Sequence, residues 1–186
     1  LLEWPLFPLI NTYPAHPITR NLDAVLSRFI SSIDTVKASG VSKQPLLYTS
    51  QDSRIKGAPV NVSIQDVLNT NPESYDNGSV PVVYLLEGSF TSLYKNRFLP
   101  VEETSLVESS VPTKLLVVAD GDMIRNDVNP RTGQPQPLGF DPFSQYTFAN
   151  EDFITQAIAC PSDSIHDRKY SVPSAHSAFG AYFVSS

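Results

Sequence analysis

Two nearly continuous apolar runs constrain the fold more than any other feature of the sequence. Residues 80–86 read Val-Pro-Val-Val-Tyr-Leu-Leu, and residues 115–119 read Leu-Leu-Val-Val-Ala. Runs of this length without polar alternation are typical of strands that are buried on both faces of a sheet. A sheet covered on both sides indicates an α/β fold, with a mostly parallel or mixed sheet and helices over its faces.

Shorter patterns predict the other elements. Residues 45–50 read as a third strand, and the alternation in residues 60–64 predicts a further one. In residues 22–33 the apolar positions recur at helical spacing, which predicts a helix with Asn21 as its N-cap. Proline and glycine are frequent in residues 124–149, which we expect to form a long loop.

A second helix is expected after this loop. Asn150 is a suitable cap, and Glu151 and Asp152 give the acidic first turn that helices favour. We expect this helix to continue to about Ala159 and to end at the Cys160-Pro161 pair.

Composition excludes several classes of protein. The 186 residues carry a formal net charge of −6, which disfavours a nucleic-acid partner. The single cysteine, Cys160, cannot form an internal disulfide, and we expect it to be a small buried residue at a helix end. No P-loop and no Gly-x-Gly-x-x-Gly motif is present, so no cofactor is expected. The chain begins without methionine, which suggests a fragment of a longer protein.

The sharpest candidate for chemistry is Asp120-Gly121-Asp122, which directly follows an apolar run. Two carboxylates on one turn could bind a divalent cation in a metal-assisted hydrolase. The alternative is an Asp-Gly turn whose carboxylates accept local N–H groups. Arg125 and Asn126 follow closely and could bind a sugar or a carboxylate, or could simply be solvated.

Other catalytic patterns are missing. The Gly-x-Ser-x-Gly elbow of serine hydrolases does not occur. His16, His166 and His176 are too dispersed for a metal site, and we assign the latter two no function.

The loop of residues 124–149 is too aromatic for a disordered linker. We expect two or more of its rings to be buried against the sheet near the Asp120 turn, with Arg125 and Arg131 at a rim where a partner protein could bind. The loop could also only cover the sheet end, or its aromatic side chains could belong to a glycan-binding module. The four rings are those of Phe140, Phe143, Tyr146 and Phe148.

Residues 113–154 carry a resemblance to a known family. They run from Thr-Lys-Leu-Leu-Val-Val-Ala-Asp-Gly-Asp to Tyr-Thr-Phe-Ala-Asn-Glu-Asp-Phe-Ile and resemble the gliding-associated ABC transporter auxiliary component, the GldG-type protein. Upstream segments extend the resemblance over about residues 1–159; these are residues 16–23, 31–35, 45–50, 85–90 and 95–97.

The resemblance implies a non-catalytic extracytoplasmic domain of a membrane-anchored subunit, on the periplasmic side of the inner membrane. Such a subunit works beside a permease and an ATPase, and its transmembrane helices would lie outside this sequence. The implied fold is a fragment of a glutamine-amidotransferase-like or flavodoxin-like domain over residues 1–159. This fold favours a strand over a helix for residues 25–33. Residues 160–186 depart from the family pattern and are expected to form a separate, uncharacteristic tail.

Overall fold

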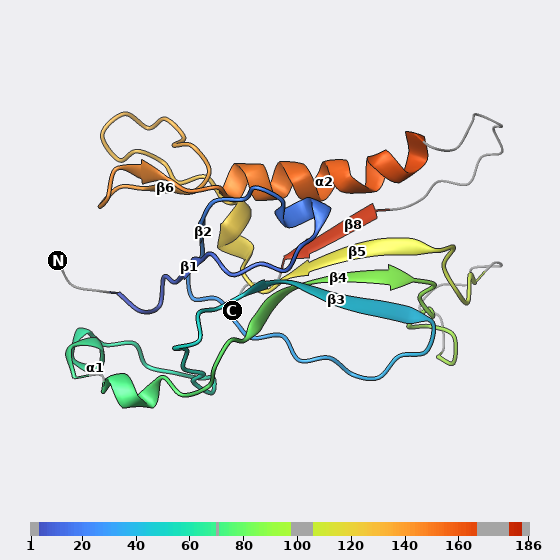
Figure 1. Cartoon of the computed structure of the whole chain (residues 1–186), viewed down its shortest axis with the longest axis horizontal. Coiled ribbons are helices and arrows are strands. Elements are labelled where there is room, and N and C mark those ends of the chain that lie inside the picture. Colours follow the sequence, from blue (N-terminus) through green and yellow to red (C-terminus); the bar gives the residue numbers. More distant parts are fainter. Residues whose placement is uncertain (1–3, 70, 98–105, 167–178, 184–186) are drawn as a thin grey trace.

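The computed structural model describes residues 4–69, 71–97, 106–166 and 179–183 (Figure 1). The described strands are β1 (Leu9–Ile10), β2 (Val25–Leu26), β3 (Val41–Tyr48), β4 (Pro81–Gly88), β5 (Thr113–Val118), β6 (Phe140–Asp141), β7 (Tyr146–Thr147) and β8 (Phe179–Phe183). The described helices are α1 (Ile64–Leu68) and α2 (Asn150–His166), with 3₁₀ turns η1 (Pro17–Thr19), η2 (Pro72–Ser74) and η3 (Gly121–Ile124).

The central sheet has the strand order β3-β4-β5-β8. Both β3-β4 and β4-β5 pair antiparallel, and β8 alone runs parallel to its neighbour β5. Two further antiparallel pairs, β1-β2 and β6-β7, lie outside this sheet. The expectation of a parallel, flavodoxin-like or glutamine-amidotransferase-like α/β fold is therefore wrong. A continuous apolar run shows that a strand is buried, but it does not show the direction of the neighbouring strand.

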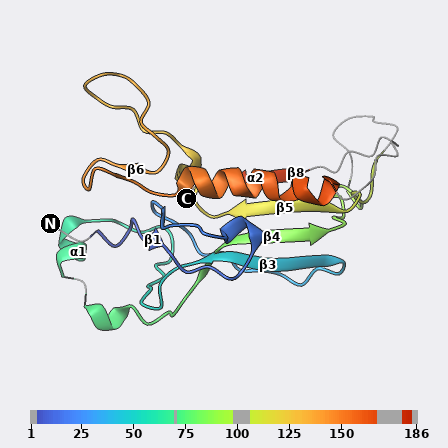
Figure 2. The same ribbon diagram turned by 45° about the horizontal axis from the view of Figure 1, so that its top comes forward.

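One face of the sheet packs against α2 (Figures 1 and 2). Val83 of β4 and Val118 of β5 are paired in register, and both belong to the same buried cluster as Phe153 of α2. Val82, the neighbour of Val83, is also buried although its side chain points to the opposite face. The predicted strands at residues 45–50, 80–86 and 115–119 are thus confirmed. Among the described residues, however, α2 is the one long helix, and it packs on a single face of the sheet.

The prediction of a helix over residues 22–33 is wrong. The structure has only the short strand β2 there, paired with β1, and Phe29 has a left-handed backbone with φ of 51°. The N–H of Ser27 donates to the carbonyl of Pro8, at 3.2 Å. Partners elsewhere in the chain therefore bind the N–H groups that a helix would have used internally.

Three further elements differ from expectation. Residues 60–64 form no strand; α1 begins at Ile64, and the N–H of Val67 donates to the carbonyl of Ser63. The loop after η3 contains the β6-β7 hairpin. The helix α2 begins at Asn150 as predicted, but it continues past Cys160 to His166. The division of the chain at residue 159 stays a prediction, and His176 lies outside the described residues.

Phe153 is the main anchor of α2, because its side chain is 0% exposed. Replacing it with alanine should lower the free energy of unfolding by about 3–5 kcal/mol, since a large cavity would remain between α2 and the sheet. Ile158→Ala on the same helix is the matched control, because Ile158 is 58% exposed and should cost below about 1 kcal/mol. Urea unfolding of both variants would measure the difference, and equal losses would contradict this packing.

Candidate functional site

The Asp120 carboxylate lies at the end of β5 and is only 3% exposed. Asp120 caps η3, with its Oδ1 accepting from the N–H of Asp122 at 2.8 Å. Its Oδ2 accepts from the N–H of Arg28, far away in sequence, at 2.7 Å. Burial raises the pKa of Asp120 above its ordinary value, and these two N–H bonds act in the opposite direction. The carboxylate therefore holds two distant backbone segments together.

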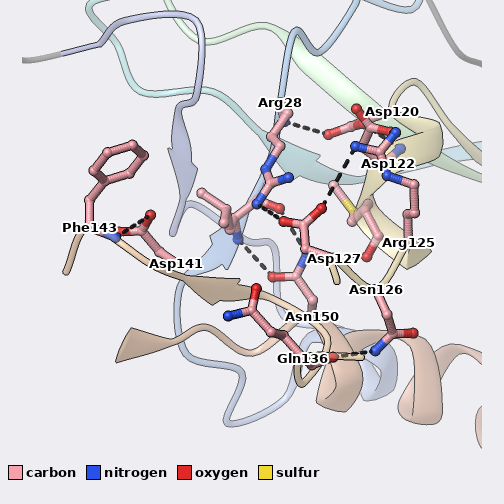
Figure 3. Close-up of polar contacts among 12 residues, drawn as sticks. Arg28, Asp120, Asp122, Arg125, Asn126, Asp127, Gln136, Asp141, Phe143 and Asn150 are labelled. Carbon is pink, nitrogen blue, oxygen red and sulfur yellow. Dashed lines mark hydrogen bonds and ion pairs between the residues drawn. The ribbon is translucent and has the colours of Figure 1, made fainter. Parts of the chain in front are cut away.

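Around this turn, acidic and basic side chains form ion pairs with one another (Figure 3). Arg125 pairs with Asp122 at 2.7 Å, and Arg28 pairs with Asp127 at 2.6 Å. A longer contact of 3.9 Å joins Arg125 to Asp127. The hydrogen bond from Arg28 to Asp127 raises the pKa of the guanidinium, so Arg28 stays positively charged. We call Arg28, Asp122, Arg125 and Asp127 the ionic cluster.

Asn150 makes a second connection to the same N-terminal segment. Its Oδ1 accepts from the N–H of Leu26 at 2.9 Å, and its Nδ2 donates to the carbonyl of Leu26 at 2.8 Å. The same Nδ2 also lies 3.2 Å from the carbonyl of Met123 in η3. Gly139 must lack a side chain here, because a Cβ would lie 2.7 Å from the Asn150 Oδ1, at a φ of 77°. Asn150 thus pairs with Leu26 as a neighbouring strand would.

The structure brings only some of the predicted site residues together. Asp120, Asp122 and Arg125 meet at the turn, whereas Asn126 donates to the carbonyl of Gln136 within the loop, at 2.8 Å. Arg131 is exposed, and its N–H donates to the Oδ1 of Asn129. Sequence reasoning missed the role of Arg28. Nothing in the local sequence marks it, because its partners lie about a hundred residues away.

The expected burial of the loop aromatics is wrong. Phe143 is 84% exposed, Tyr146 is exposed, and Phe140 and Phe148 are only half-buried. Figures 1 and 2 show the reason: the loop and its hairpin extend beyond the N-terminal end of α2, away from the sheet. Tyr146 packs edge to face on Phe148 at 5.0 Å, so two of the rings contact each other instead of the core.

The geometry of the turn favours a structural role for the carboxylates. Both oxygens of Asp120 already accept N–H groups, and Asp122 is paired with Arg125. Within the described residues no group of three or more His, Cys, Asp or Glu side chains is arranged to hold a metal ion. Cys160 is half-buried and packs against the core.

The described residues thus form a sheet-and-helix domain with a paired polar centre at the end of β5 and an exposed loop after η3. The chain belongs to the family described as ABC-type uncharacterized transport system, whose model matches residues 1–157. It is accordingly an auxiliary component of an ABC-type transport system. Neither the curated proteins nor the solved structures include a significant match. In the part of the chain that is described, no helix has the length and apolar character needed to cross a membrane.

Asp120→Asn should lower the free energy of unfolding by about 1–3 kcal/mol. The new amide places an NH₂ group against one of the two backbone N–H donors, and that buried donor then lacks an acceptor. Asp122→Asn in the same turn is the matched control. It breaks only the partly exposed pair with Arg125 and should cost below about 1 kcal/mol. Denaturant unfolding at pH 7 would test this, and a larger loss for Asp122→Asn would contradict the assignment.

The raised pKa of Asp120 also predicts a pH dependence. The folded state binds the proton more tightly than the unfolded state, in which the pKa is near its ordinary value of 3.8. Between these two pKa values unfolding releases a proton, so stability falls as pH rises through this window. The stability advantage of the wild type over Asp120→Asn should therefore decrease as pH rises above about 4. Urea unfolding of both proteins from pH 3.5 upward would measure it; an advantage that grows with pH would refute the shift.

Proposed function

We propose that this chain is a non-catalytic accessory domain of the GldG type. It acts on the periplasmic side of the inner membrane, beside the permease and ATPase subunits of a transporter for gliding motility or cell-surface export. The observation that carries the proposal is the family match over residues 1–157. The Asp120 turn supports the non-catalytic part, because its carboxylates are engaged in holding the backbone.

The loop that carries the β6-β7 hairpin is the proposed contact with the transporter. Phe143 is exposed on this loop, and the carboxylate of Asp141 accepts from the N–H groups of Phe143 and Ser144. Phe143 is thus presented on a turn with a defined conformation. An exposed aromatic side chain on such a turn is a typical anchor of a protein–protein interface, and the exposed Arg131 in the same loop adds a cation.

Phe143→Ala should weaken association of the chain with its permease and ATPase subunits by about tenfold or more, if the ring inserts into the partner surface. The free energy of unfolding should stay within about 0.5 kcal/mol of the wild type, because the ring is exposed. Co-purification from membranes that contain the subunits, followed by titration of the purified proteins, would measure the effect.

Val36→Ala is the matched control, because Val36 is an equally exposed apolar residue (82%) that lies outside the loop. The control should bind as the wild type does. Failure of the wild-type chain to associate with either subunit would refute the transport partnership. ATP hydrolysis or amidase turnover by the purified chain would refute the non-catalytic role. Wild-type affinity of the Phe143→Ala variant would contradict only the assignment of the loop as the contact with the transporter.

A further inference from the structure

A groove of about 680 Å³ has no lining residue from α2 and includes Val82 of β4, whose side chain points away from the face that packs against α2. Its walls are the N-terminal segment around Leu6, residues 29–32, and the segment between β3 and β4 that carries α1. In both ribbon views this segment lies beside the N-terminal trace (Figures 1 and 2). The volume falls within the range of about 300–1,000 Å³ that is typical of small-molecule sites.

The groove gathers apolar side chains that the fold leaves exposed. Phe29, Ile55, Val60 and Val62 all line it, and each is between 44% and 52% exposed. Single exposed apolar residues are normal on a protein surface, but several that converge on one concave site mark a place where an apolar ligand binds.

The backbone at Phe29 is an independent sign of function. Its φ of 51° is an unfavourable conformation for a bulky residue, and such strain concentrates at ligand sites. Three contacts hold it: the N–H of Phe29 donates to the carbonyl of Leu6, the ring packs edge to face on Phe7, and the preceding N–H of Arg28 donates to Asp120. The buried carboxylate at the end of β5 therefore also positions the Phe29 ring in the groove wall.

Two cations, Arg54 and Lys56, line the same groove. Among the described residues neither forms an ion pair; the guanidinium of Arg54 donates to the hydroxyl of Ser74 at 3.2 Å. Asp52 is the single carboxylate in the lining, so the groove carries a net positive charge on a chain whose net charge is −6. Unpaired cations beside an apolar surface favour an anionic group on the ligand.

A second hollow of about 580 Å³ adjoins the groove and shares Arg54, Lys56 and Val60 with it. The rest of its lining is polar, with the side chains of Asn61, Asn69, Asn71 and Ser74. Arg54 and Lys56 thus lie at the border between the apolar groove and a hollow lined by asparagine residues.

We propose that the two hollows together bind one anionic amphiphile. Its hydrocarbon chain lies in the groove against Phe29 and Val60, its phosphate or carboxylate pairs with Arg54 and Lys56, and its polar head group faces the asparagine-lined hollow. The ligand is a free molecule, bound as a monomer. The inference stands on the geometry of this site and does not depend on the transport role proposed above.

Binding can be measured on the intact 186-residue chain with three dodecyl probes kept below their micelle concentrations. The anionic probe is dodecyl phosphate, the cationic probe is dodecyltrimethylammonium and the uncharged probe is dodecyl maltoside. Calorimetry should show dodecyl phosphate binding at least tenfold more tightly than either of the others. Trp4 is the single tryptophan and packs on Phe7, which contacts Phe29, so its emission should change on binding.

Two pairs of variants test the assigned residues. Arg54→Gln combined with Lys56→Gln should reduce the affinity for dodecyl phosphate at least tenfold, whereas Lys37→Gln, an exposed lysine outside the groove lining, should leave it unchanged. Val60→Glu should abolish binding by placing a carboxylate in the groove. Val128→Glu is its matched control, because Val128 is an exposed valine of the loop after η3. Urea unfolding verifies that each variant is folded.

Three results would overturn the proposal: equal affinity for the cationic and anionic probes, full affinity in the Arg54→Gln/Lys56→Gln variant, or binding to anionic lipid vesicles without binding to the monomeric probe. Association with the permease and ATPase is a separate measurement on the loop near Phe143. Failure of one proposal therefore leaves the other to be judged on its own result.

Discussion

Two buried polar side chains, Asp120 and Asn150, connect the first part of the chain to the rest of the domain. Asp120 binds the N–H of Arg28, and Asn150 binds both backbone groups of Leu26. Among the described side chains no buried polar atom lacks a hydrogen-bond partner, so hydrogen bonds offset part of the cost of burying these two groups. The start of α2, the end of β5 and the strand β2 depend on these few bonds for their relative positions.

The predictions from sequence succeeded where the signal is local. The apolar runs that became β3, β4 and β5 are buried because of their own composition, and the acidic residues Glu151 and Asp152 mark the first turn of α2. Asn150 does not cap this helix as predicted, because its side chain binds Leu26 and Met123. Residues 22–33 have helical periodicity, but their N–H groups bond to Pro8, Asp120 and Asn150. The sheet direction was also mistaken, because strand order and direction depend on long connections that no local pattern reports.

The same distinction holds for the candidate site. Asp120, Asp122 and Arg125 are close in sequence, so their meeting at one turn was predictable, whereas Arg28 reaches Asp127 only through the fold. Two or more rings of the loop of residues 124–149 were expected to be buried against the sheet. The hairpin of this loop is instead fixed by short-range bonds such as those of Asp141, and the rings of Phe143 and Tyr146 remain exposed. Membership of the transport family came from the match over residues 1–157, while the groove beside Phe29 became visible only in three dimensions.

The span between Leu26 and Asn150 has a consequence for synthesis on the ribosome. The two residues are 124 positions apart, so the segment around Leu26 is synthesised well before its partner Asn150. Contacts of such separation slow folding, because a long loop must close before they form. Until then Ile10, Ile18 and Val25, which are buried in the finished domain, have no core to join. These apolar side chains therefore stay exposed until Asn150 has been made, and a chaperone that shields apolar segments would act on residues 9–26.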